Sequence, residues 1–356
     1  MTTARNTIAD RLRWQAGWCD KLGSPLYTAI LEAAADDVER GGPSWKLLEG
    51  REREPARSFL ALRLTGAVHR LVHIGRLPEL AALYPSTGGE VDLELAPRRF
   101  IEALSDHADE VREHLDRPVQ TNEVGRCAGL IGGFLLVARE TGLPITALEV
   151  GASAGLNLRF DRYRYSSGGA AWGDASSAVR FDDVFESGAP PLDASLEVAE
   201  RRGCDAHPLD PRSEEDRLTL LSYVWPDQTH RFGQLRAALE IAARDDVVVE
   251  EAQASAWAEG VLAEARPGAA TVLFHSIVVQ YLTPEEGTAL HDAITAAGRR
   301  ATPEAPFAWL FLEPGEGDLA AVRLTLWPGG EERLLARTGF HSSPVTWLYP
   351  DRRAST

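Results

Sequence analysis

The stretch Ile145-Thr-Ala-Leu-Glu-Val-Gly-Ala-Ser-Ala-Gly-Leu-Asn157 decides the fold that we expect for this chain. Its apolar half, 145–150, follows a Gly-Leu-Pro turn and predicts a short buried strand. We expect a small-residue turn after Gly151 and a helix that begins near Gly155. Glycines let a backbone pass close to a ligand, and a helix N-terminus offers free N–H groups. The stretch therefore predicts a site for a nucleotide-type ligand, where the acidic side chain can bind an amine or a hydroxyl.

The same residues also match the nucleophile elbow of α/β-hydrolases, as Gly151-x-Ser153-x-Gly155. In that interpretation Ser153 is the nucleophile, and Glu313 and His341 follow it in the correct chain order. A hydrolase elbow follows a central strand, so several strands should precede it. A nucleotide-binding glycine loop instead follows the first strand, so the remaining strands should come after it in the chain.

Composition indicates an ordinary globular protein of 356 residues that carries 37 Lys and Arg against 53 Asp and Glu, for a net charge of −16. This charge disfavours nonspecific contact with nucleic acid or an anionic membrane, although a local basic groove stays possible. Cys19, Cys127 and Cys204 form neither a zinc pattern nor a disulfide framework. With no signal-peptide core and no bilayer-length apolar run, we expect a cytoplasmic protein without a metal.

The first third of the chain shows the apolar spacing of helices, from residue 8 to about residue 115. The alternating segment 91–95 predicts the one brief strand there. We therefore expect a helical cap domain over residues 1–118. A further apolar helix is expected over 127–141, with Thr121 or Asn122 as its cap.

From residue 145 onward, strands and helices alternate. Expected helices span 214–224, 231–244, 254–265 and 284–298. Expected strands span 159–165 and 178–182 (a hairpin), 196–200, 246–250, 270–276, 307–312, 322–327, 333–336 and 345–348. Such alternation builds a mostly parallel sheet with helices on both faces and a ligand site beyond the carboxyl ends of the strands. We predict an α/β domain over 119–356, with a hairpin insertion at about 159–195 and an antiparallel C-terminal hairpin. Because almost all strands follow the glycine loop, this order disfavours the hydrolase.

Two resemblances extend this interpretation. Leu148–Gly155 resembles motif I of class I S-adenosylmethionine-dependent methyltransferases, which implies a methyltransferase-like (Rossmann-type) sheet. A wider set of segments resembles an uncharacterised bacterial family, domain of unknown function family 2332: 149–158, 201–210, 225–228 and 274–281. This second resemblance covers nearly the whole chain and implies no particular activity.

The methyltransferase resemblance implies a set of residues that bind S-adenosylmethionine. Its loop, which holds the methionine part, corresponds to Glu149, Gly151, Ala152, Ser153, Gly155 and Asn157. The acid that ends the second strand in that family accepts the ribose hydroxyls, and Asp205 is the candidate. The acid that contacts adenine is missing at the next strand, where Gln253 stands as a substitute donor.

Candidate catalytic residues follow two later strands. His275 and Ser276 end the strand expected over 270–276, and His275 either acts as a general base or is a structural histidine bonded to backbone. Glu313 follows the next strand and is expected to bind a substrate cation or pair with an arginine. We expect methyl transfer to an oxygen or nitrogen of a small molecule, without nucleic-acid or membrane partners. The alternative is a non-catalytic nucleotide- or metabolite-binding protein on a degenerate methyltransferase fold.

Overall fold

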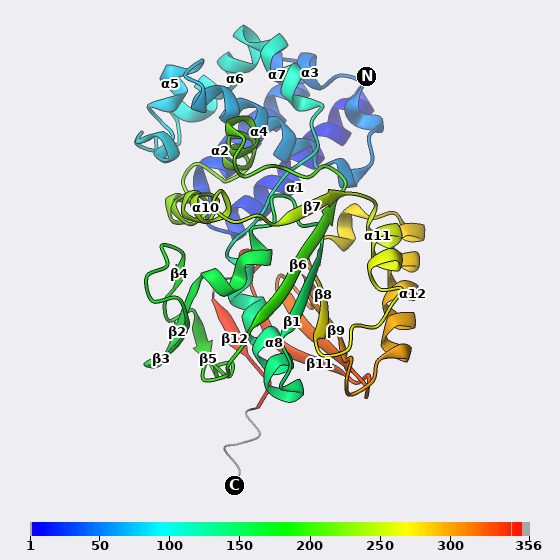
Figure 1. Ribbon diagram of the computed structural model, residues 1–356. Helices are drawn as coiled ribbons and strands as arrows, with labels where there is room; N and C mark the ends of the chain where they lie inside the picture. The colour runs from blue at the N-terminus through cyan, green and yellow to red at the C-terminus, as the bar shows by residue number, and fades with distance from the viewer. Residues whose placement is uncertain (1, 343, 351–356) are drawn as a thin grey trace. The chain divides into compact units, whose positions relative to one another are not determined.

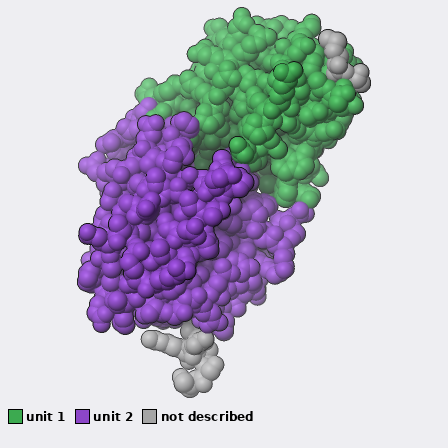
Figure 2. Space-filling view, turned by 90° about the vertical axis from the view of Figure 1, so that its right-hand side faces the viewer, with its two compact units in different colours: residues 1–121, 214–236 green, residues 122–213, 237–356 purple. Residues whose placement is uncertain are grey.

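The computed structural model describes residues 2–342 and 344–350, and the chain forms two compact units (Figures 1 and 2). Unit 1 comprises Met1–Thr121 and Glu214–Arg236, and unit 2 comprises Asn122–Ser213 and Ala237–Thr356. Unit 1 thus includes a later segment of the chain, 214–236. No sequence pattern indicates that this segment belongs with the N-terminal helices.

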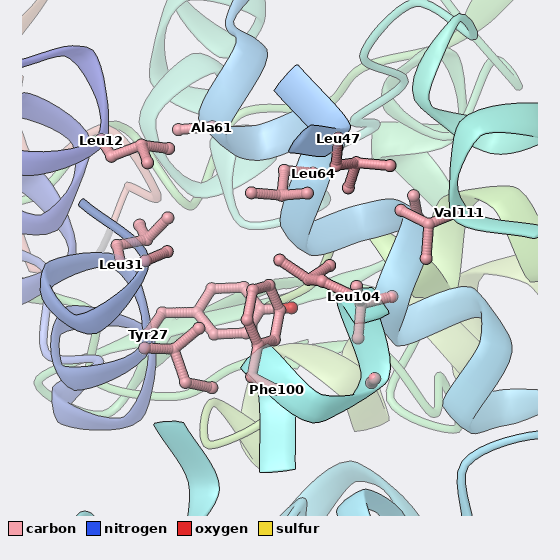
Figure 3. Packing of buried hydrophobic residues seen from close by; sticks show 14 of the residues in the cluster. Leu12, Tyr27, Leu31, Leu47, Ala61, Leu64, Phe100, Leu104 and Val111 are labelled. Atoms are coloured by element: carbon pink, nitrogen blue, oxygen red, sulfur yellow. The ribbon is translucent and has the colours of Figure 1, made fainter. Parts of the chain in front are cut away.

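Unit 1 is helical. Its elements are α1 (Thr2–Lys21), α2 (Pro25–Arg40), α3 (Pro43–Leu48), η1 (Arg51–Arg53), η2 (Ala56–Ser58), α4 (Leu60–His73), α5 (Pro78–Ala81), η3 (Pro85–Thr87), α6 (Leu95–Asp106), α7 (Ala108–Leu115), α9 (Glu214–Ser222) and the start of α10 (Thr229–Ala242). Figure 3 shows its core, where Leu31 of α2, Leu64 of α4 and Phe100 of α6 are buried together. The brief strand predicted at 91–95 is wrong, because the Asp92 carboxylate accepts the N–H groups of residues 94 and 95 and starts α6 instead.

Unit 2 contains a sheet of nine strands in the order β5-β12-β11-β10-β9-β8-β1-β6-β7. The strands are β1 (Ile145–Val150), β5 (Phe185–Ser187), β6 (Val198–Asp205), β7 (Val248–Glu251), β8 (Ala270–Ser276), β9 (Phe307–Pro314), β10 (Ala320–Trp327), β11 (Glu332–Thr338) and β12 (Val345–Trp347). Neighbours from β7 to β9 are parallel, those from β9 to β12 are antiparallel, and β5 joins β12 in parallel. The predicted mixed α/β class with a mostly parallel sheet is confirmed.

Strand β1 lies inside the parallel part of the sheet, and the chain leaves it in both directions. It first adds β6 and β7 on one side, and later adds β8 and β9 on the other. The strand order therefore reverses between β1 and β8, and in open α/β sheets ligands bind at such a reversal, beyond the carboxyl ends of the strands. From Thr2 onward no strand precedes β1, so the layout that a hydrolase elbow needs is not there.

Helices cover both faces of this sheet (Figure 1). On one face, α8 (Arg126–Thr141) packs against β8 to β11, and Phe134 stacks on Phe160 at 3.8 Å between ring centroids. On the other, α11 (Ala254–Val261) and α12 (Pro284–Arg300) bury Leu148 and Leu273. Since both faces are covered, all six residues of β1 are buried, as a continuous apolar run predicts.

Two local predictions are wrong. The helix expected near Gly155 is a six-residue 3₁₀ helix, η4 (Asn157–Arg162), which is kinked at Arg159. The predicted hairpin between 159–165 and 178–182 is instead formed by β2 (Arg164–Ser167) and β3 (Ala170–Gly173), around two glycines with positive φ. The short strand β4 (Arg180–Phe181) then pairs with β2 in parallel.

Candidate functional site

The sequence-predicted site residues lie along one edge of the unit 2 sheet. Asp205 ends β6, Glu149 precedes the glycine loop after β1, and His275 and Ser276 end β8. Glu313 lies at the end of β9, and Gln253 follows β7. Because carboxyl ends of parallel strands meet at the same edge of a sheet, Asp205 and His275 flank the loop after β1 from its two sides.

The glycine loop turns back onto the neighbouring strand β6. The N–H groups of Gly151 and Ala152 both donate to the Cys204 carbonyl, at 2.9 and 3.0 Å. The Ser153 N–H donates to Oδ2 of Asp205 at 2.9 Å. These bonds use the loop's donors within the protein, and no α-helix starts here. The prediction of free N–H groups at a helix N-terminus is therefore wrong.

Asn122 completes the loop from the opposite side. Its Oδ1 accepts hydrogen bonds from the Ala154 and Leu156 N–H groups, at 3.2 and 3.0 Å. The sequence predicted a helix cap at Thr121 or Asn122, but α8 begins at Arg126 without a side-chain cap. Asn122 stabilises the loop instead, and sequence reasoning missed this role because the two segments are far apart in the chain.

The loops after β1 and β8 touch each other. Gly151 has φ +71, and a Cβ at this position would lie 2.4 Å from Cγ2 of Val278. Two non-glycine residues have left-handed backbone here, Ser153 with φ +51 and Ile277 with φ +52. Such a conformation costs most for a β-branched residue, so the surrounding contacts must hold it in place. Backbone strain of this kind is often found at ligand-binding sites.

Glu149 is a buried carboxyl group with little to stabilise its charge. It is 1% exposed, and its Oε2 has no hydrogen-bond partner in the part of the chain that the structure describes. Burial raises its pKa well above the ordinary value, against the opposing effect of a hydrogen bond with Asn157. Asn157 is itself fixed, since its Oδ1 lies 3.2 Å from the Cys127 thiol. An incoming cation would find an acceptor here.

His275 is held at both ring nitrogens. Its Nδ1 lies 2.8 Å from Oε1 of Glu313, and its Nε2 accepts the indole N–H of Trp309 at 3.1 Å. Because Nε2 accepts, the proton of the neutral ring is on Nδ1 and points to Glu313. The predicted action of His275 as a general base would require one of these bonds to break. The structural alternative, a histidine bonded at a strand end, fits this geometry, with side chains as its partners.

Glu313 links this histidine to the loop after β8. Its Oε1 also accepts the N–H groups of Val278 and Val279, at 2.8 and 3.4 Å, at the start of η5 (Val279–Tyr281). The partner is therefore His275 and not the arginine that the sequence suggested. The carbonyl of Ser276 accepts a hydrogen bond from Arg126 at 3.0 Å. Glu313 and Arg126 thus hold the backbone of the loop after β8 in place.

Asp205 and Gln253 occupy the other side of the site. Each Asp205 carboxylate oxygen accepts one N–H, Oδ2 from Ser153 and Oδ1 from His207 at 2.9 Å. A carboxylate has about four lone-pair positions, so both oxygens retain capacity for a ligand hydroxyl. Gln253 is exposed and precedes α11 without capping it by its side chain.

The chain matches the model of one protein family over residues 9–347, described as "Uncharacterized protein conserved in bacteria (DUF2332)". It belongs to the DUF2332 family. This membership confirms the resemblance to the bacterial family. No curated protein and no solved structure matches the chain. Within its described residues, this DUF2332 protein has no helix that is both long and apolar enough to cross a bilayer, and no group of three or more potential metal ligands from His, Cys, Asp and Glu.

Proposed function

We propose that unit 2 is a methyltransferase-like (Rossmann-type) domain that binds S-adenosylmethionine and transfers its methyl group to an oxygen or nitrogen of a small molecule. One observation carries the proposal: the glycine loop and Asp205 end adjacent strands, β1 and β6, next to the reversal of strand order. This is the placement that the motif I resemblance implies.

The residues present fit such a cofactor. The buried Glu149 carboxyl has an unpartnered oxygen, which suits the ammonium of a methionine moiety. The other loop residues, Gly151, Ala152, Ser153, Gly155 and Asn157, would surround that moiety, and Asp205 would accept the ribose hydroxyls. Gln253 would donate to adenine in place of the missing acid. The bound cofactor would supply an activated methyl group.

The acceptor would have to be a nucleophile that needs no protein base. Both nitrogens of His275 are bonded, so we assign to His275, Ser276 and Glu313 the positioning of the loop after β8. Methyl transfer depends mainly on holding the two reactants in line and excluding water. A weakly basic amine, such as an aromatic amine, or an oxygen already ionised in solution, meets this requirement.

Calorimetric titration with S-adenosylmethionine and S-adenosylhomocysteine tests the proposal. The test variant is Gly151→Ala, whose new Cβ would meet Val278 in the loop contact. The matched control is Gly142→Ala, which has φ +68 but no atom within 4 Å of the new Cβ. We expect saturable binding to the wild type and the control, and affinity at least about tenfold weaker for Gly151→Ala, or a loss of about 1.4 kcal/mol. No saturable binding to the wild type would remove the proposal.

A second candidate is a non-catalytic metabolite-binding protein on the same fold. The engaged His275 ring and the absence of an acid at Gln253 favour it. Both candidates predict binding in the titration. They differ in methyl transfer, measured with radiolabelled cofactor over a panel of aromatic amine and carboxylate acceptors. Product formation with any acceptor excludes the non-catalytic candidate.

A further inference from the structure

A pocket in unit 2 lies at the end of α8 that is far from the predicted site residues. The helix begins at Arg126, which donates to the Ser276 carbonyl at the carboxyl edge of the sheet. The pocket includes Glu140 in the last turn of the helix, roughly 20 Å away at 1.5 Å per helical residue. Its volume of about 410 Å³ falls in the range of small-molecule sites, so it is a candidate for a second ligand site.

Arg333 of β11 lines this pocket and carries two unused donors. Its Nη1 donates to Oε1 of Glu140 at 2.5 Å and to the Tyr349 hydroxyl at 3.5 Å, and the guanidinium lies over the Tyr349 ring. Among the described residues, Nε and Nη2 have no hydrogen-bond partner, and both are open to solvent. Nε and Nη2 form the fork that binds both oxygens of a carboxylate, as in Arg76 with Glu110 at 2.8 and 3.1 Å. The pocket thus presents two parallel donors to a carboxylate.

Glu331 is a second charged group in the same lining. It lies two residues before Arg333 and directly ahead of β11, and alternate residues of an extended chain point to the same side. Its side chain is exposed and makes no hydrogen bond or ion pair within the part of the chain that the structure describes. A ligand that reaches the Arg333 fork therefore also has an acceptor for an ammonium group beside it.

The charges of the lining disfavour simpler ligands. A plain carboxylate at Arg333 meets repulsion from Glu140 and Glu331, and a plain amine leaves the arginine fork unused. A molecule that carries an ammonium and a carboxylate on one carbon atom satisfies both groups at once. The apolar part of the lining, which includes Leu136 and Trp347, is then left for the rest of the ligand.

We propose that this pocket binds a free α-amino acid with an apolar side chain. Its carboxylate accepts from Nε and Nη2 of Arg333, and its ammonium pairs with Glu331. Its side chain packs against Leu136, Pro191 and Trp347. This site is independent of the proposed methyltransferase function, because none of its residues belongs to the proposed cofactor set.

The test is a ligand-observed NMR titration of the full chain with L-leucine and L-phenylalanine. N-acetyl-L-leucine, which lacks the ammonium, and L-leucinamide, which lacks the carboxylate, are the matched probes. Arg333→Gln removes the fork, and Glu331→Gln removes the acceptor charge at an exposed position where the fold does not depend on it. Their controls are Arg337→Gln, which also breaks a surface ion pair on β11, and Glu332→Gln, both outside the pocket lining. Thermal melting checks that each variant is folded.

We expect L-leucine or L-phenylalanine to bind saturably to the wild type and to both controls, and to bind Arg333→Gln and Glu331→Gln about tenfold or more weakly. N-acetyl-L-leucine and L-leucinamide should each bind the wild type about tenfold or more weakly than L-leucine. The proposal is overturned if neither amino acid binds, if Glu331→Gln or a folded Arg333→Gln binds as tightly as its control, or if either matched probe binds as tightly as L-leucine.

Discussion

Glu149 and Glu313 end two strands of one sheet, and both are buried with an Oε2 that finds no partner among the described residues. The two residues differ in the hydrogen bonds that their other carboxyl oxygens accept. Oε1 of Glu313 accepts three hydrogen bonds, from His275 and from two backbone N–H groups. Glu149 has a hydrogen bond with Asn157, and burial raises its pKa well above the ordinary value.

The difference teaches that burial alone does not give a carboxyl group its role. Donors that surround a carboxylate stabilise its charge and are themselves held in place by it. Glu313 therefore fixes the loop after β8. Glu149 has too few hydrogen-bond donors around it to stabilise an ionised carboxylate. A cation that binds beside it would therefore change its charge state. Each prediction below changes one side of this comparison.

The largest effect is expected for Glu313→Ala. The substitution leaves the Nδ1 proton of His275 and the N–H groups of Val278 and Val279 without their acceptor. We expect the free energy of unfolding, measured by urea denaturation, to fall by about 4 kcal/mol. Glu316→Ala is the control, because its 87% exposed side chain makes only a surface pair with Arg337 and should cost less than about 1 kcal/mol. Equal losses would mean that Glu313 does not hold the loop.

The next effect tests the contact between the two loops. Gly151→Ala must adopt φ +71 and also displace Val278, whose Cγ2 would be 2.4 Å from the new Cβ. Gly142→Ala adopts nearly the same φ in open space. We expect losses of about 3 kcal/mol and about 1 kcal/mol respectively in the same denaturation experiment. If the two losses are the same, then the loops after β1 and β8 are not packed together.

A smaller effect is expected at Asn122, which supports the loop on the Glu149 side. Asn122→Ala leaves the N–H groups of Ala154 and Leu156 unpaired, and we expect a loss of about 2 kcal/mol. Asn122→Asp keeps an acceptor oxygen and should restore most of that stability. If Asn122→Asp is as unstable as Asn122→Ala, the hydrogen bonds to the side-chain oxygen are not what stabilises the loop.

The sequence was sufficient for the mostly parallel sheet and for the positions of most elements along the chain, because apolar runs and their breaks are local signals. Strand β1 spans the predicted residues, and Glu149, Asp205 and His275 meet at the same edge, as parallel strands require. The helix expected near Gly155 is a kinked 3₁₀ helix instead. The N–H groups of Ala154 and Leu156, just before it, donate to Asn122 more than thirty positions earlier, a contact that no local pattern indicates.

The pairing of His275 with Glu313 shows the same limit. Both residues follow recognisable strands, but their contact depends on register. His275 pairs with Phe311, which puts the side chains of Trp309 and Glu313 on the same face of the sheet as His275. Register is set by packing across 38 residues of sequence and not by local pattern. The motifs therefore identified the Glu313 carboxylate and the His275 imidazole, but not the hydrogen bonds that these two groups make.

The smallest effect, and the most specific, is the pH dependence of Glu149→Gln. Burial raises the folded pKa of Glu149 above its unfolded value, so its contribution to stability is complete below the ordinary glutamate range and is lost as pH rises toward the folded pKa. Glutamine resembles the neutral carboxyl at every pH. The variant should match the wild type near about pH 4 and exceed it by on the order of 1 kcal/mol near about pH 8, measured by urea denaturation across that range. Glu313→Gln should show no such gain, because it weakens the acceptor of three donors. A Glu149→Gln difference that is constant with pH would show that the carboxyl is ionised in the folded protein, and the comparison with Glu313 would then fail.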